Sequence, residues 1–240
     1  MSPQTFVIPN FVDCDVFRPV RHAEERTAVR KRLGLTGDAL VYGCGGAVKR
    51  HHKLIDFLLR EYTEFLHGQC DGKGPSSEPW LFVIGSRTPD TEMLLQMAET
   101  LAPGRVRFLT DQARSEMPSL LQVLDVFVLP SLFEMMPIAV LEAMATGLPV
   151  IVHRHPVLEW MAGPDSCVEM DKPGALARAL RLAMSIDWRL ENGRRMRDRA
   201  ERMFNKPVIL DQIIRMYEDV KLPAVPTPGG RDVVSERNPP

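Results

Sequence analysis

The sequence predicts a doubly wound α/β fold with a mostly parallel sheet of six strands. Short apolar runs recur along the chain, and stretches with helical spacing separate them. Hydrophobic residues make up 45% of the 240 residues and charged residues 25%, proportions that allow a packed core. Alternation of this kind implies right-handed crossovers, which place helices on both faces of a parallel sheet.

The six expected strands are apolar without strict alternation, as strands covered on both faces should be. They are Leu40–Cys44, Leu81–Ile84, Val106–Phe108, Val126–Leu129, Val150–Val152 and Cys167–Met170. Ligands of such folds bind at the carboxyl ends of the strands. Functional groups are therefore expected in the loops that directly follow these runs.

Helices are expected between and after the strands, because apolar residues there recur at intervals of three and four. Their expected ranges are 53–66, 89–101, 115–124, 137–146, 173–184, 187–203 and 207–220. Ser115 is the predicted N-cap of the third helix. The fourth begins at Pro137 and ends before Gly147 and Pro149, the usual signals of a helix start and end.

The folded domain is expected over residues 21–221, and a change in amino-acid composition marks its C-terminal boundary. Residues 222–240 are rich in proline, glycine and charge, and we expect this tail to be disordered. Residues 67–79 carry the same signs and are expected to form a loop.

Charge and cysteine content argue against several classes of function. The formal net charge is −1, so the basic footprint of a nucleic-acid-binding protein is absent from the sequence. The four cysteines are scattered without a CxxC pair, which argues against zinc or a disulfide framework. No membrane span or signal peptide is predicted. We expect a cytoplasmic location, with peripheral attachment to a membrane left open.

The loop after the first strand combines glycine with positive charge. Gly43, Gly45 and Gly46 allow a tight turn, and five basic residues follow at positions 49–53. A glycine turn before a helix N-terminus with cations suits a phosphate group. The spacing matches neither the dinucleotide-binding glycine motif nor the P-loop. The alternative is a glycine turn with a polar helix entry and no ligand.

Two carboxylates stand eight positions apart in an apolar stretch. Glu142 belongs to a helix that is apolar on every side, the pattern of a buried helix, and a buried carboxylate is costly unless it is paired. Glu134 precedes that helix at the end of a strand. Both acids are expected to face one crevice. The alternative is that neighbouring backbone N–H groups satisfy Glu142 and that Glu134 is solvated.

These residues resemble a known family. The block "EMMPIAVLEAMATGLPVI" at 134–151 resembles the E-x7-E block of retaining glycosyltransferases of family 4, or group 1, which have two Rossmann-like domains in the GT-B architecture. The segment "VIPNFVDCDVFRP" at 7–19 is similar to the linker between those domains. The segments "WLFVIGS" at 80–86 and "RVRFLTD" at 105–111 are similar to later strands, so the resemblance runs in order from Val7 to Ile186.

The resemblance implies the C-terminal, donor-binding half of such an enzyme, preceded by a linker-like segment over residues 1–20. A nucleotide-diphosphate sugar would bind at the carboxyl edge of the sheet, without a metal ion or other cofactor. Glu142 would hold the ribose hydroxyls and Glu134 the transferred sugar, while basic residues would neutralise the departing diphosphate. A direct part in catalysis is assigned to Glu134, Arg50 and His51. The implied nucleotide-sugar-binding residues are Gly45, Gly46, Lys49, Lys53, Gly85, Asp111, Met135, Met136, Pro137 and Glu142.

Two departures from the family pattern bear on activity. The family usually shows Arg-x-x-x-x-Lys-Gly near the first helix, whereas here Gly46 replaces the arginine and His51 or His52 falls at the lysine. A neutral histidine stabilises phosphate less well at pH 7. Met135 occupies the position of a family glycine, where its side chain would crowd the diphosphate.

The resemblance also concerns the acceptor-binding half of such enzymes. The chain begins at what looks like the interdomain linker, so the resemblance implies a separate N-terminal domain or subunit as partner. With it, a sugar would pass to a hydroxyl with retained anomeric configuration. One alternative is a catalytically impaired module that partners a complete transferase. Another is a domain like those of sugar-nucleotide epimerases, which would need its own second domain and catalytic acids.

Overall fold

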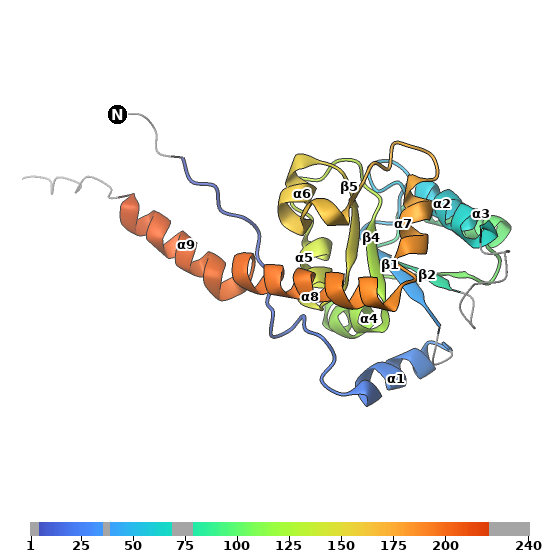
Figure 1. Cartoon of the computed structure of the whole chain (residues 1–240), viewed down its shortest axis with the longest axis horizontal. Coiled ribbons are helices and arrows are strands. Elements are labelled where there is room, and N and C mark those ends of the chain that lie inside the picture. The colour runs from blue at the N-terminus through green and yellow to red at the C-terminus, as the bar shows by residue number, and fades with distance from the viewer. Residues whose placement is uncertain (1–4, 36–38, 69–78, 221–240) are drawn as a thin grey trace, which may run out of the picture.

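The protein is described here by a computed structural model that covers residues 5–35, 39–68 and 79–220 (Figure 1). Most of the predicted loop at 67–79 and the predicted tail at 222–240 lie outside the described residues. None of the helices in the described ranges combines the length and the apolar character needed to cross a bilayer.

A six-stranded parallel sheet forms the centre of the fold, in the order β3-β2-β1-β4-β5-β6. This confirms the predicted fold class. The strands are β1 (Val41–Gly45), β2 (Trp80–Gly85), β3 (Val106–Thr110), β4 (Val126–Leu129), β5 (Val150–His153) and β6 (Cys167–Val168). The strand order reverses between β1 and β4, so the carboxyl ends of these two strands flank a topological switch point.

Helices cover both faces of the sheet (Figure 1). They are α1 (Ala23–Arg32), α2 (Ile55–His67), α3 (Thr91–Leu101), α4 (Met117–Val123), α5 (Ile138–Ala145), α6 (Pro156–Ala162), α7 (Ala175–Leu182), α8 (Ile186–Met203) and α9 (Lys206–Asp219), with 3-10 turns η1 (Arg114–Glu116) and η2 (Pro164–Ser166). Residues of α2, α3 and α7 pack one buried core with the sheet, and residues of α4, α5, α6 and α8 pack the other.

Helix starts differ from the predicted ranges by one or two residues, and two residues named at those starts have other positions. The prediction of Ser115 as an N-cap is wrong, because Ser115 lies inside η1 and α4 begins two residues later. Pro118 explains the shift, since proline lacks an N–H and fits the first turn of a helix. Pro137 precedes the first helical residue of α5 instead of being that residue, in an extended conformation with φ −73° and ψ 115°.

The N-terminal segment runs along the junction of α8 and α9 (Figure 1). The Val12 N–H donates to the Phe204 carbonyl, and the Lys206 N–H donates to the Val12 carbonyl, each at 2.9 Å. Arg197 of α8 donates to the carbonyls of Cys14 and Phe17 at 3.1 and 2.9 Å. These bonds hold residues 12–17 against α8 and α9.

Candidate functional site

A cleft of about 420 Å³ opens at the carboxyl edge of the sheet, where the fold predicts ligand binding. It receives residues from the ends of β1, β2 and β3 and from the first two turns of α5. Five residues that the sequence predicts as ligand-binding line it: Gly45, Gly46, Gly85, Asp111 and Glu142. The parallel sheet thus brings together groups that are far apart in the sequence.

Two of these glycines allow the loops after β1 and β2 to touch. A methyl group on Gly85 would overlap the carbonyl oxygen of Gly46, so only glycine fits there. Gly46 has a φ of +132°, a conformation that residues with a side chain rarely adopt. Its N–H donates to the Ile84 carbonyl at 3.0 Å. The cleft wall at this point is therefore bare backbone, which a ligand can approach closely.

Glu142 is buried in the cleft, with 2% of its surface exposed. Arg114 of η1 forms an ion pair with it, and the guanidinium also lies over the Phe17 ring, 5.4 Å from its centre. Burial raises the pKa of the Glu142 carboxyl above its ordinary value, and the hydrogen bond and charge of Arg114 oppose that rise. The alternative of a carboxylate satisfied by neighbouring N–H groups is wrong, because the partner found is an arginine.

Glu134 is also buried, with 8% of its surface exposed, so the alternative of a solvated carboxylate is wrong. Lys53 forms an ion pair with it, and the His52 imidazole lies 3.9 Å away. The Lys53 side chain passes close to Gly46, because a methyl group there would come within 3.4 Å of the lysine Cε. The expectation that both acids face one crevice is wrong in detail, because Glu142 lines the cleft whereas Glu134 and Lys53 do not. Lys53 instead connects Glu134 to Gly46, on the wall of the cleft that contains Glu142.

Strained backbone is concentrated at this edge of the sheet. The non-glycine residues with positive φ in the described ranges are His52, Leu54 and Asp111, at 71°, 49° and 55°. The first two flank Lys53, and Asp111 follows β3 and lines the cleft. Its carboxylate accepts a hydrogen bond from the Arg87 N–H at 3.0 Å. Strain of this kind persists where the surrounding structure enforces it, and it is frequent at functional sites.

None of the four predicted basic residues lines the cleft, and among them only Lys53 pairs with Glu134 or Glu142. Arg50 approaches Asp56 at 3.5 Å and its N–H donates to Asp90 at 3.0 Å. His51 is exposed and Lys49 partly exposed. The loop after β1 therefore directs Lys53, and not Lys49, Arg50 or His51, toward Glu134. Their roles in catalysis or binding stay predictions.

The loop before α5 does not block the cleft. Met135 is 79% exposed, and neither Met135 nor Met136 lines the cleft. The Met136 carbonyl accepts from the Asn10 side-chain amide at 3.0 Å, which ties this loop to the N-terminal segment. The crowding predicted for Met135 has no counterpart in the cleft as the structure shows it. Ile138 and Ala139, the first residues of α5 after Pro137, line the cleft instead.

Sequence reasoning missed Arg114, which partners the buried Glu142. The residue follows β3 at the same sheet edge as the other cleft residues, so the rule that function follows the strand ends includes it. Its pairing with Glu142 depends on the position of η1 and could not be read from spacing. Among the described residues, no group of three or more His, Cys, Asp or Glu is arranged to hold a metal ion.

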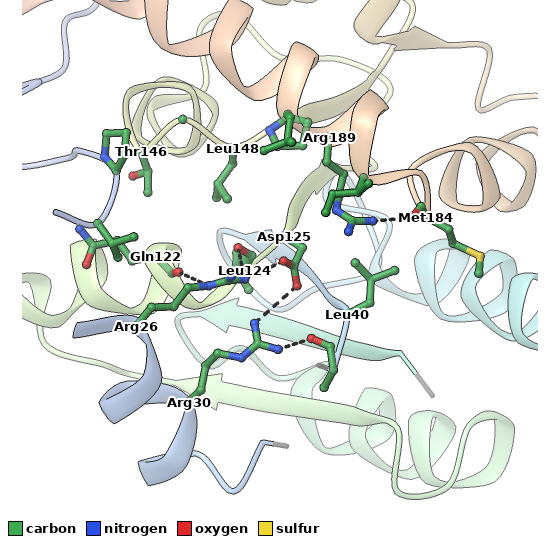
Figure 2. Close-up of a pocket in the computed structure, with 17 residues that line it drawn as sticks. Arg26, Arg30, Leu40, Gln122, Leu124, Asp125, Thr146, Leu148, Met184 and Arg189 are labelled. Carbon is green, nitrogen blue, oxygen red and sulfur yellow. Dashed lines mark hydrogen bonds and ion pairs between the residues drawn. The ribbon is translucent and has the colours of Figure 1, made fainter. Parts of the chain in front are cut away.

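A larger cleft of about 550 Å³ lies at the opposite, amino edge of the sheet (Figure 2). We call it the basal cleft. It lies between α1, the starts of β1, β4 and β5, and the first turn of α8. The glycine contact, the two paired acids and the strained residues all lie at the carboxyl edge, so the smaller cleft there is the candidate active site.

The parallel sheet, the bare glycine wall and the paired acids together define a Rossmann-like domain with a cleft at its carboxyl edge, where folds of this kind bind ligands. Comparison with known proteins gives the family. A model of the glycosyl transferases group 1 family matches residues 39–185, more than half of the chain. The chain belongs to this family.

The chain is also similar in sequence to a curated protein and similar in fold to solved structures. A lipopolysaccharide core biosynthesis mannosyltransferase from Rhizobium meliloti is 28% identical over 151 residues, which cover 60% of this chain and 39% of the relative. Sucrose-phosphate synthase from Thermosynechococcus elongatus has a similar fold, with a TM-score of 0.76 at 23% identity over 91% of this chain and 53% of that one. HepE from Anabaena, solved with UDP and glucose, is similar in fold with a TM-score of 0.75 at 18% identity. The match covers 90% of this chain and 57% of HepE. This chain therefore spans about half of these structures.

Proposed function

We propose that this chain is the donor-binding domain of a retaining glycosyltransferase, which binds a nucleotide-diphosphate sugar in the carboxyl-edge cleft. The observation that carries the proposal is the arrangement of the two acids. Glu134 and Glu142 are both buried, each is paired with a cation from the end of a different strand, and Gly46 links their surroundings. The HepE structure with UDP and glucose supports a nucleotide sugar as the ligand class.

The proposed roles follow from the chemistry of each part. Glu142 would accept hydrogen bonds from the two ribose hydroxyls, exchanging them for its bond to Arg114. A carboxylate with two oxygens suits a vicinal diol, because each oxygen accepts one O–H group. Arg114, which is mostly exposed, would then be free to move toward the nucleotide.

The diphosphate would lie between the glycine wall and the start of α5. Ile138 and Ala139 line the cleft there, and the first N–H groups of a helix have no partner within the helix. These groups and the helix dipole favour negative charge. Lys53 supplies a positive charge beside Gly46, where charge develops on the departing phosphate. Glu134, which Lys53 holds, would contact the transferred sugar.

Transfer requires more than this cleft. The sugar would pass to an acceptor hydroxyl with retained configuration and without a metal ion, and a second domain or subunit would supply the acceptor. The alternative is a binding module that partners a complete transferase without catalysing transfer itself. The cleft lining favours this alternative, because none of the three predicted catalytic residues, Glu134, Arg50 and His51, belongs to it.

Calorimetric titration of the chain with UDP, GDP and ADP tests the proposal. We expect saturable binding of one of the three, weakened about tenfold or more by Glu142→Gln, because a hydrogen bond to a charged group contributes about 1.5–3 kcal/mol. Glu99→Gln is the matched control, since Glu99 is exposed on α3. Repeating the titration with a chelator tests the need for a metal.

The outcomes separate the two functions. Binding that depends on Glu142, together with slow hydrolysis of the matching nucleotide sugar, supports a donor domain. Binding without hydrolysis or transfer in the presence of candidate acceptor domains supports the non-catalytic module. Absence of binding for all three nucleotides would refute a nucleotide site.

A further inference from the structure

The basal cleft has the size and the mixed lining of a small-molecule site. Its volume of about 550 Å³ is within the range of ligand pockets in proteins, which are mostly apolar with a few polar groups. It lies at the edge of the sheet opposite the donor cleft, and the two clefts share no lining residue. A ligand bound there would therefore occupy a site separate from the proposed donor site.

The charged side chains that line the basal cleft are three arginines and one aspartate. Arg26 and Arg30 come from α1 on one wall, and Arg189 comes from α8 on the opposite wall (Figure 2). Asp125 lies between them, at the start of β4. Among the described residues, the lining therefore carries a net positive charge, which favours an anionic ligand.

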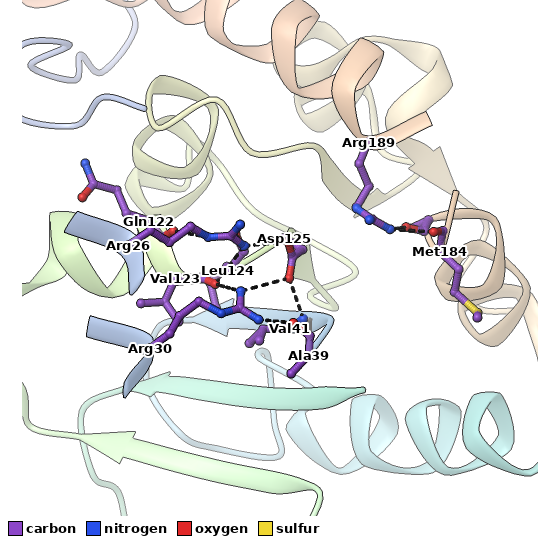
Figure 3. Close-up of polar contacts among 11 residues, drawn as sticks. Arg26, Arg30, Ala39, Val41, Gln122, Val123, Leu124, Asp125, Met184 and Arg189 are labelled. Atoms are coloured by element: carbon purple, nitrogen blue, oxygen red, sulfur yellow. Dashed lines mark hydrogen bonds and ion pairs between the residues drawn. The ribbon is translucent and has the colours of Figure 1, made fainter. Parts of the chain in front are cut away.

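Asp125 neutralises only part of the arginine charge, and both of its carboxylate oxygens already have partners in the protein (Figure 3). One oxygen accepts from Arg26 at 2.6 Å. The other accepts from the Val41 N–H at 2.8 Å and lies 3.6 Å from Arg30. Arg30 is buried and also donates to the carbonyls of Val123 and Ala39. Asp125 and Arg30 thus form a fixed polar base for the cleft.

Arg26 and Arg189 keep donors for a ligand. The hydrogen bonds of Arg26 use Nε and Nη2, and those of Arg189 use Nη1, which donates to the carbonyls of Ala183 and Met184 at 2.9 and 2.6 Å. Within the described ranges, Nη1 of Arg26 and the Nε and Nη2 groups of Arg189 donate to no protein atom. Guanidinium groups with free N–H donors match carboxylate and phosphate oxygens.

The rest of the lining is apolar. Leu40, Leu124 and Leu148 are buried side chains that reach the cleft, and Leu190 stands at its rim with 62% of its surface exposed. A fully hydrated inorganic ion gains nothing from this surface. A ligand that carries an apolar body as well as an anionic group would cover it and remove it from water.

We propose that the basal cleft binds a small organic anion, a phosphate ester or a carboxylate. Its charged group lies between Arg26 and Arg189, and its apolar body covers Leu40, Leu124 and Leu148. Because α1 forms one wall and follows the N-terminal segment, the bound anion fixes the position of the segment that precedes the domain. The inference does not depend on the proposed donor site.

Methyl NMR of the whole chain tests the proposal, with phenyl phosphate and benzoate as probes. Phenol and inorganic phosphate are the matched controls, since each supplies only one part of the expected ligand. We expect saturable shifts of the Leu40, Leu124 and Leu148 methyl signals with phenyl phosphate or benzoate, and binding about tenfold weaker or more for phenol and inorganic phosphate. The relative affinity of the two probes identifies the anionic group.

Two variants test the role of charge. Leu190→Glu places a carboxylate beside the arginines, and the exposure of Leu190 makes the change compatible with the fold. Arg189→Met removes donors, and we expect each variant to weaken probe binding about tenfold. Arg194→Met is the control for charge on α8, because Arg194 is exposed and lies outside the basal cleft. Unchanged thermal unfolding shows that each variant is folded.

The location of the shifts decides the outcome. Shifts confined to Ile84 and Ile138 place the probes in the donor cleft and overturn the proposal, as does the absence of saturable shifts up to about 10 mM probe. Binding that Leu190→Glu leaves unchanged also overturns it. Glu142→Gln should leave probe binding intact, so a failure of the proposed donor function does not affect the result.

Discussion

At the scale of single residues, the site is built from two carboxylates that the fold removes from water. The cost of burying each one is offset by a cation, Arg114 for Glu142 and Lys53 for Glu134. The cations come from loops after β3 and β1, so each pair joins two strand ends. The pairs hold the acids in place, and a ligand that replaces Arg114 must match its hydrogen bond to Glu142.

Burial of Glu142 predicts a pH dependence of stability. Because its folded pKa lies above the ordinary value of 4.5, the native state binds this proton more tightly than the unfolded state. The contribution of Glu142 to the free energy of unfolding is therefore most favourable below pH 4.5. This contribution is lost as pH rises through the folded pKa of Glu142. Glu142→Gln removes this loss, so we expect the variant to be more stable at pH 7 by about 1 kcal/mol.

Urea unfolding of Glu142→Gln and the wild type between pH 4 and pH 8 measures this difference. The gain should shrink toward low pH, where the wild-type carboxyl is also protonated. A gain that is constant with pH would show that packing, and not the charge of Glu142, causes it. Glu99→Gln should change stability by less than about 0.5 kcal/mol at every pH.

At the scale of elements, α1 is held to the domain by polar contacts more than by an apolar face. Arg30 is its one buried residue, and Val29 and Leu33 are only partly buried against the core. Arg26 and Arg30 connect the helix to Asp125 and to backbone carbonyls at the base of the sheet (Figure 3). Such contacts need partners in fixed positions, so the sheet has to form before they can hold α1.

Asp125→Asn tests this attachment. The change leaves two arginines without their carboxylate, and we expect the amide hydrogens of α1 to exchange about tenfold faster or more, with the central strands much less affected. Hydrogen exchange with mass spectrometry measures both regions. Asp198→Asn is the matched control, because Asp198 forms an exposed ion pair with Arg202 on α8. Equal acceleration in α1 and in β1 would mean that Asp125 stabilises the whole domain instead.

At the scale of the whole molecule, the sheet separates two cores and two edges. Each core is a continuous set of buried apolar side chains on one face of the sheet. The carboxyl edge carries the candidate active site, and the amino edge carries the basal cleft. The two clefts are therefore joined by rigid strands that both cores hold in place.

The reactivity of the buried cysteines measures whether this packing is intact. Burial raises the pKa of Cys14 and Cys167 to about 11 and that of Cys44 to about 12, so these thiols are protonated and inaccessible at pH 8. In a Cys70→Ser background, we expect alkylation at pH 8 to be slow in buffer and to accelerate at the urea midpoint of unfolding. Mass spectrometry of the alkylated chain measures it. Fast alkylation of Cys44 in buffer would contradict the packing described for β1.

The sequence alone determined the sheet and the two acids. All six strands were predicted to within two residues at each end, because runs that are apolar on both faces are readable from composition and spacing. Glu134 and Glu142 stood out because charge is rare in such an apolar stretch. Both signals are local in the chain.

Only the tertiary structure decided which groups meet. Helix α1 escaped prediction because it lacks an apolar stripe, and its contacts with the end of α4 and the start of β4 are with residues about a hundred positions away. The pairing of Arg114 with Glu142 and the choice of Lys53 over its basic neighbours depend on loop conformations with positive φ. Burial is readable from the pattern of apolar residues, whereas the partner of a buried charge depends on distances that exist only once the sheet has formed.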